Sequence, residues 1–177
     1  VSGGLHGVGV SCVNALSESL KATVYREGKI WEQEYERGKP NYAVREAGPT
    51  DRRGTTVTFK PDPQIFQQTL EYSYDTLANR MRELSYLNKG ITIVMEDRRQ
   101  KDEKGEILTE TFHSKEGLKE FITFLDATRE SIIQEVISIE GEKNGIPVEV
   151  AMVYNTSFSE NLHSYVNNIN THEGGTH

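Results

Sequence analysis

Two stretches of alternating apolar and polar residues, joined by a two-residue turn, constrain the fold of this chain more than any other feature. Lys21–Arg26 and Lys29–Arg37 alternate on either side of Glu27-Gly28. A period of two is that of a β-strand, and a short glycine-containing turn connects antiparallel neighbours. Thr55–Lys60 is rich in β-branched residues and is predicted to be a further strand. The intervening Gly48–Gly54 is predicted to be a polar turn.

The same pattern returns in the C-terminal part of the chain. Val136–Glu140 and Ile146–Tyr154 flank Lys143-Asn144-Gly145, in which Asn-Gly is a strong hairpin signal. Asn161–Ile169 is predicted to continue as a third strand. The chain therefore contains two regions dominated by local antiparallel pairing.

Helices are predicted between these regions. Ser73–Asn88 carries an apolar stripe and is followed by Gly90, and a second helix is expected over residues 118–125 with Ser114 as its cap. Arg80 and Arg82 on the longer helix are expected to face solvent. The shorter segments between them are predicted to be a strand over Ile91–Met95, a charged turn over Asp97–Gly105 and a strand over Ile107–Phe112. Together these elements predict the α+β fold class.

Composition narrows the cellular context. The chain has 177 residues, a net charge of −7 and one cysteine. A single cysteine excludes a disulfide framework and fits the reducing cytoplasm. No apolar run approaches the roughly 20 residues that span a bilayer, so we expect no membrane association. The acidic balance argues against general affinity for polyanions.

The first residues carry the strongest candidate for chemistry. In Gly3-Gly4-Leu5-His6-Gly7-Val8-Gly9, the glycines allow close approach of the backbone to a ligand. They directly precede a predicted helix, whose free N–H groups favour an anion such as phosphate. The spacing is neither that of the Walker motif nor that of the Rossmann motif. The alternative is a glycine-rich helix entry used only for packing. The helix up to Ser17 is apolar on much of its surface and is predicted to be buried, with Cys12 as a small core residue.

Val1–Ser17 resembles the lid motif of the GHKL ATPases, and its form SGGLHGVGVSCVNALS is similar to that of the ATPase subunits of type IIA DNA topoisomerases. Two further segments agree. Arg53–Phe59 (RGTTVTF) resembles the strand whose threonine helps to bind adenine through water in that family. Tyr165–His177 (YVNNINTHEGGTH) resembles a segment early in its transducer domain, and this wording argues against MutL-like and Hsp90-like relatives. The resemblance covers the whole chain in the expected order.

The resemblance implies a domain organisation and a ligand. Residues 1–125 would be the C-terminal part of a GHKL (Bergerat) ATPase α/β sandwich, 126–131 a linker, and 132–177 the start of a ribosomal-S5-like transducer domain. ATP is the implied ligand and Mg²⁺ the implied cofactor. Thr55 would lie at the adenine end of the site, and Val57 would line the pocket. The lid residues implied to contact the triphosphate are Leu5, His6, Gly7, Val8 and Gly9, with Val10 beside them.

The groups that perform hydrolysis in this family are expected outside the chain. Its general-base Glu, metal-binding Asn and adenine-reading Asp precede the lid, and the transducer Lys that contacts the terminal phosphate follows the segment corresponding to residues 165–177. We therefore expect an internal fragment that holds no catalytic residue and no metal ligand. Phosphoryl transfer needs positioning, metal and charge stabilisation together, so the fragment alone is predicted not to hydrolyse ATP.

In the whole enzyme, the resemblance implies that ATP closes the lid and drives dimerisation of two such subunits. A DNA segment would then pass through a break made with the DNA-cleaving partner subunit, in a heterotetramer. Among type IIA enzymes the chain looks most like the bacterial enzyme that supercoils DNA, with the decatenating enzyme as close competitor. The interpretation from another class is a non-catalytic α+β interaction domain whose glycines serve packing.

Overall fold

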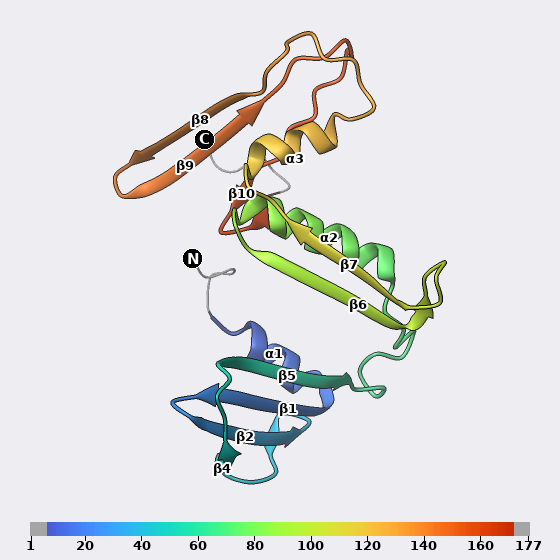
Figure 1. Cartoon of the computed structure of the whole chain (residues 1–177), viewed down its shortest axis with the longest axis vertical. Coiled ribbons are helices and arrows are strands. Elements are labelled where there is room, and N and C mark those ends of the chain that lie inside the picture. The colour runs from blue at the N-terminus through green and yellow to red at the C-terminus, as the bar shows by residue number, and fades with distance from the viewer. Residues whose placement is uncertain (1–6, 172–177) are drawn as a thin grey trace. The chain divides into compact units, whose positions relative to one another are not determined.

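The chain folds into two units, one up to Glu71 and one from Tyr72 onward (Figure 1). The structure is a computed structural model and describes residues 7–171. Each unit combines helix with antiparallel strands, which confirms the predicted α+β class. The predicted linker at 126–131 lies within the second unit, and the division into family domains at that point stays a prediction. No helix among residues 7–171 is long and apolar enough to cross a membrane.

The first unit is a short helix beside an antiparallel sheet. Strand β1 lies between β2 and β5, and both β3 and β4 pair with the other side of β2. Its elements are α1 (Gly9–Ala15), β1 (Ser17–Arg26), β2 (Lys29–Glu36), β3 (Lys39–Pro40), β4 (Arg45–Pro49) and β5 (Gly54–Pro61).

The predicted N-terminal hairpin is confirmed in position. Arg26 pairs with Lys29 across Glu27-Gly28, and both turn residues have positive φ, at 55° and 77°. Positive φ at both central residues defines the type I′ turn, whose twist matches that of the flanking strands. The strand predicted at Thr55–Lys60 is also confirmed, as β5.

Within residues 72–171, the second unit contains three hairpins and two helices. Helix α2 packs on the β6–β7 hairpin, and α3 packs on the β8–β9 hairpin and on α2. The elements are α2 (Tyr74–Leu87), β6 (Thr92–Lys101), β7 (Ile107–His113), α3 (Leu118–Leu125), β8 (Ile137–Lys143), β9 (Ile146–Met152), β10 (Tyr165–Val166) and β11 (Ile169–Asn170).

The two predicted helices and the second hairpin of the sequence pattern are confirmed. Ser73 caps α2, its hydroxyl accepting a hydrogen bond from the Thr76 N–H at 3.3 Å. The β8–β9 turn is Asn144-Gly145, again with both φ values positive. Ser114 lies one turn before α3 and accepts from the N–H of Gly117, so it orders the approach to the helix instead of its first turn.

The structure differs from the sequence prediction at three strands. The predicted turn 97–105 is shorter, because β6 continues to Lys101 across a register shift. The predicted loop after Gly48 begins later, since Arg45–Pro49 pairs with β2 as β4. The predicted third strand 161–169 is wrong. Asn167 and Asn168 adopt positive φ and fold this segment into the small β10–β11 hairpin.

The register shift in β6 begins at a buried carboxylate, that of Asp97. Asp97 is 6% exposed and accepts hydrogen bonds from the Arg99 side chain at 2.6 and 2.9 Å and from the Arg99 N–H at 2.9 Å. These bonds favour the ionised form and lower the pKa of Asp97 to about 2 from an ordinary value of 3.8. The folded pKa is the lower one, so this stabilisation is present above the unfolded pKa and is lost as the pH falls through the folded pKa.

We therefore expect Asp97→Asn to lower the free energy of unfolding near neutral pH. The difference from the wild type should shrink as the pH falls from about 4 to about 2, where the wild-type carboxyl also becomes neutral. Urea unfolding at a series of pH values measures this difference. Glu103→Gln, on the exposed turn, is the matched control and should show little difference at any pH. A difference for Asp97→Asn that is independent of pH would contradict the role of the carboxylate charge.

Candidate functional site

The predicted phosphate-binding segment leads into α1. Leu5 and His6 lie outside the described residues, while Gly7 to Val10 are described. Gly7 has φ +64°, a left-handed conformation that glycine adopts without steric cost. Val8 follows as the residue before the helix, and its carbonyl accepts the first helical bond from the Cys12 N–H at 2.9 Å.

The glycines do not make room for a neighbouring atom among the described residues. A Cβ added at Gly7 or Gly9 would meet no atom within 4 Å, whereas one added at Gly38 would meet the Cα of Ala15 at 3.3 Å. Close packing therefore accounts for Gly38 but not for Gly7 or Gly9 in this part of the chain. The positive φ of Gly7 is a requirement of the backbone, and no described atom occupies the space beside Gly7 or Gly9.

The prediction that this helix is buried is wrong for the described residues. Helix α1 has no buried residue, and Cys12 is exposed instead of being a small core residue. Val8 and Val10 are exposed as well. The reason is that β1 is the main element packed against α1 within residues 7–71, so most of the apolar surface of the helix stays uncovered.

The two residues predicted for the adenine end lie on β5. Thr55 pairs with Val24 of β1, and Val57 pairs with Ala22. Residues two apart on a strand share a face, and directly paired residues of adjacent strands lie on the same face. Thr55 and Val57 therefore belong to one face of the sheet.

That face is apolar and largely uncovered. It also carries Phe59, whose partner across the ladder is Leu20. Leu20 is 4% exposed, but Val57 and Phe59 are 41% and 44% exposed. An apolar sheet face left open in this way is the kind of surface against which a flat aromatic ligand or further apolar chain packs. Phe59 was not predicted as a site residue, although its period-two spacing from Val57 was visible in the sequence.

The buried residue Asp62 connects the end of β5 to the end of α1 through its backbone N–H. Asp62 is 2% exposed, and its N–H donates to the carbonyl of Leu16 at 3.0 Å. Its carboxylate accepts from the Gln64 N–H at 2.9 Å and from Arg37 at 2.6 Å. Both bonds lower the pKa of Asp62, the Gln64 N–H contributing most. This contact places the helix that follows the lid and the strand that carries Thr55 and Val57 in one unit.

The described residues show no ligand set for a metal. No group of three or more His, Cys, Asp or Glu side chains that could hold an ion occurs within residues 7–171. His163, which lies in this range, contacts the ring of Phe121 at a centroid distance of 6.5 Å.

Comparison with known proteins gives consistent matches. A family model described as DNA gyrase B matches residues 117–177. Over all 177 residues the chain is 60% identical to DNA gyrase B of Cytophaga hutchinsonii and covers 37% of that protein. It is 49% identical over its whole length to DNA gyrase B of Bacillus mycoides and covers 43% of it. The chain thus spans well under half the length of these relatives.

A solved structure agrees in fold. The 43K ATPase domain of Thermus thermophilus gyrase B, in complex with an aminocoumarin, matches with a TM-score of 0.80 and 33% sequence identity. The match covers 93% of this chain and 44% of that one. The similarity therefore extends over nearly the whole of both units.

Proposed function

The chain belongs to the DNA gyrase B family, and on that premise we propose that it forms part of the ATPase machinery of a type IIA DNA topoisomerase. The lid residues 5–10 would contact the triphosphate of ATP through backbone amides. Thr55 and Val57, on the open apolar face of the sheet, would contact the adenine end.

The geometry at Gly7 is the observation that carries this proposal. Its positive φ turns the backbone into α1, and no described atom fills the space beside Gly7 or Gly9. Amides bordering open space at a glycine turn suit an anion, which needs donors and close approach. The match to a gyrase B ATPase domain that is solved in complex with an aminocoumarin supports the same assignment.

The residues of this chain would bind and orient the nucleotide instead of attacking it. In the mechanism that the family resemblance implies, residues preceding the lid would hold Mg²⁺ and would supply the general base. Within residues 7–171 no cluster of metal-ligating side chains fits such an ion, so no step is assigned to a metal held here. Because the general base and the metal-binding residue would both precede the lid, we propose that the 177-residue chain alone does not hydrolyse ATP.

In the longer protein, closure of the lid over ATP would favour association of two B subunits. The dimer would capture a DNA segment, which passes through a break made together with gyrase A in the cytoplasm. A bound triphosphate can order a loop, because the ligand binds the ordered conformation more tightly than the other one. The net charge of −7 implies that the main DNA contact lies in other parts of the assembly.

The test is plasmid topology with the full-length protein that contains this sequence, combined with its DNA-cleaving partner, gyrase A. We expect ATP-dependent introduction of negative supercoils into relaxed plasmid. Decatenation without supercoiling would favour the ATPase component of topoisomerase IV, the alternative that sequence similarity alone leaves open. No ATP-dependent change in either assay would contradict the proposed function.

A further inference from the structure

Polar side chains on α2 reach the β10–β11 hairpin, and Lys89, just after the helix, reaches the β8–β9 hairpin. Tyr165 of β10 donates its hydroxyl hydrogen to Glu83 at 2.7 Å, and Glu83 also pairs with Arg80 one turn earlier on the helix. Glu83 and Tyr165 are both part-buried. Hydrogen bonds to a charged acceptor with little solvent around them are among the stronger polar contacts.

The turn of the β10–β11 hairpin is held by two further bonds. Arg80 donates to the carbonyl of Asn168 at 2.9 Å, and the side-chain amide of Asn168 donates to that of Asn88 at 2.9 Å. Asn168 has φ +66°, a conformation that asparagine tolerates better than most residues. The backbone of Asn168 is thus bonded to α2, and its side chain is bonded to Asn88, the residue that ends the helix.

Aromatic rings surround the same contact. The ring of Tyr165 lies 6.1 Å from that of Phe121, which stacks on Tyr86 of α2 at 5.2 Å. Burial raises the pKa of Tyr165 well above its ordinary value, and the bond to Glu83 acts in the same direction. The hydroxyl therefore keeps its proton, and remains a donor, at every physiological pH.

The residue after Asn88 reaches the other hairpin. The amine of Lys89 pairs with Glu140 of β8 at 2.5 Å and with Glu149 of β9 at 2.9 Å. These two carboxylates are direct partners across the hairpin, so one ammonium group offsets the repulsion between them. Helix α2 and the residue pair at its end therefore contact both the β8–β9 and the β10–β11 hairpins.

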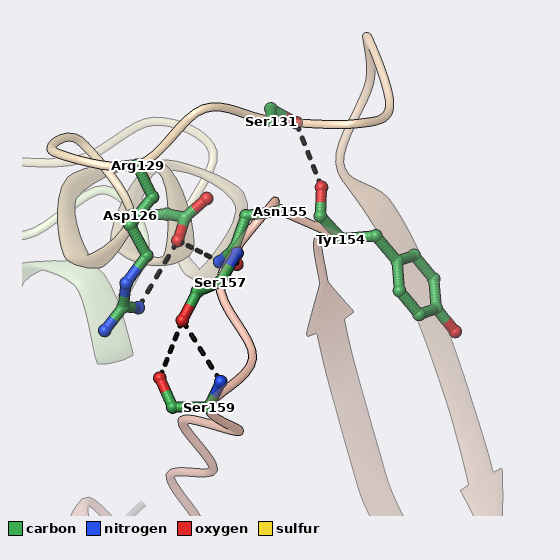
Figure 2. A network of polar contacts seen from close by, with 7 residues as sticks. All are labelled: Asp126, Arg129, Ser131, Tyr154, Asn155, Ser157 and Ser159. Carbon is green, nitrogen blue, oxygen red and sulfur yellow. Dashed lines mark hydrogen bonds and ion pairs between the residues drawn. The ribbon is translucent and has the colours of Figure 1, made fainter.

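The predicted linker is bonded as well, but to the loop after β9. Figure 2 shows Asp126 accepting from Asn155 at 2.6 Å and pairing with Arg129 at 3.4 Å. The hydroxyl of Ser131 donates to the carbonyl of Tyr154 at 3.4 Å. Residues 126–131, which follow α3, are therefore attached to this loop by hydrogen bonds at both ends.

We propose that α2 is the joint that positions the C-terminal part of this chain, with Glu83 and Tyr165 as its central positioning pair. When α2 shifts, its side-chain bonds move the β10–β11 hairpin with it, and residues 126–131 take no part. The pair holds residues 165–171, which are the first part of the segment 165–177 that the family resemblance singles out. The joint acts in the absence of nucleotide, so its test does not depend on the proposed nucleotide site.

The experiment is hydrogen–deuterium exchange of the chain without ligand. We expect Tyr165→Phe to speed exchange in residues 165–171 by about tenfold, the factor for loss of one bond to a charged acceptor. Exchange in β6 and β7 should stay unchanged. Tyr154→Phe is the matched control, because Tyr154 is 58% exposed and its ring points away from the contacts in Figure 2. Unchanged exchange in 165–171, or an equal rise in β6–β7, would overturn the proposal.

A double variant makes the test specific for the pair. Glu83→Gln keeps an acceptor for the hydroxyl but removes the charge, so exchange in 165–171 should rise less than in Tyr165→Phe. The double variant Glu83→Gln with Tyr165→Phe should exchange nearly as fast as Tyr165→Phe alone, since both act on one contact. If the increase in exchange rate of the double variant equals the product of the two single increases, the substitutions act independently. That result would contradict the assignment of Glu83 and Tyr165 to one contact. Should Tyr165→Phe unfold the unit, the same exchange measurement on Glu83→Gln decides alone, and no rise in 165–171 would count against the joint.

Discussion

Replacing Phe121 with alanine is expected to lower the free energy of unfolding of the second unit by about 3–5 kcal/mol, the cost typical of a buried phenylalanine. Phe121 on α3 is 7% exposed and is surrounded by the rings of Tyr86, His163 and Tyr165. Truncation leaves a cavity that these large rings cannot fill by small shifts. The loss would be a large share of the roughly 5–15 kcal/mol that stabilises an ordinary domain.

The matched control lies on the same helix. Phe124 is 47% exposed and contacts Tyr86 from the outside, with Arg82 over its ring at 5.5 Å. Phe124→Ala should cost less than half as much, because much of its ring is already in water. Urea unfolding followed by circular dichroism compares the two variants. Equal losses for Phe121→Ala and Phe124→Ala would contradict a core centred on Phe121.

Gly117→Ala is expected to cost about 1–3 kcal/mol from backbone strain alone, because φ +62° with ψ −119° is a region reserved almost entirely for glycine. A steric penalty adds to this. A Cβ at this position would meet Cε of Lys89 at 2.6 Å and Cγ at 2.7 Å. A lysine normally moves aside, but this one is held by Glu140 and Glu149.

The two penalties can be separated experimentally. Gly105→Ala, at φ +81° with no atom within 4 Å, measures the cost of a positive φ on an open turn. Adding Lys89→Ala to Gly117→Ala removes the clash and should restore part of the lost stability in a double-mutant cycle. Thermal unfolding of these variants provides the free energies. If Gly117→Ala costs no more than Gly105→Ala, the close approach of Lys89 is not a constraint on the fold.

Elements that depend on local chemistry were predictable from the sequence. The turns at Glu27-Gly28 and Asn144-Gly145 are set by residues within one turn of each other. Strand β4 was missed, because Arg45–Pro49 has no alternating pattern and exists only through pairing with β2. The prediction of one strand over 161–169 gave weight to its apolar residues. It overlooked the adjacent Asn167 and Asn168, which together form a tight turn.

Side-chain environments depend on tertiary neighbours and were harder to predict. Arg82 was expected to face solvent, but it pairs with Glu110 at 2.8 Å and lies over the rings of Phe112 and Phe124. In the candidate site, glycine spacing pointed to Gly7, and the resemblance pointed to Thr55 and Val57. Nothing in the local pattern indicated that Asp62 would connect the end of β5 to the end of α1.

Binding of a non-hydrolysable ATP analogue to the full-length protein tests the nucleotide site most directly. Calorimetry should show binding to the wild type and an affinity at least about tenfold lower for Gly7→Ala, because a Cβ disfavours the left-handed turn. Gly28→Ala, at φ +77° in the β1–β2 turn, carries a similar strain in a region assigned no contact with nucleotide and should bind like the wild type. Equal affinity of Gly7→Ala and the wild type, or no binding by either, would contradict the assignment of residues 7–10 as a phosphate-binding lid.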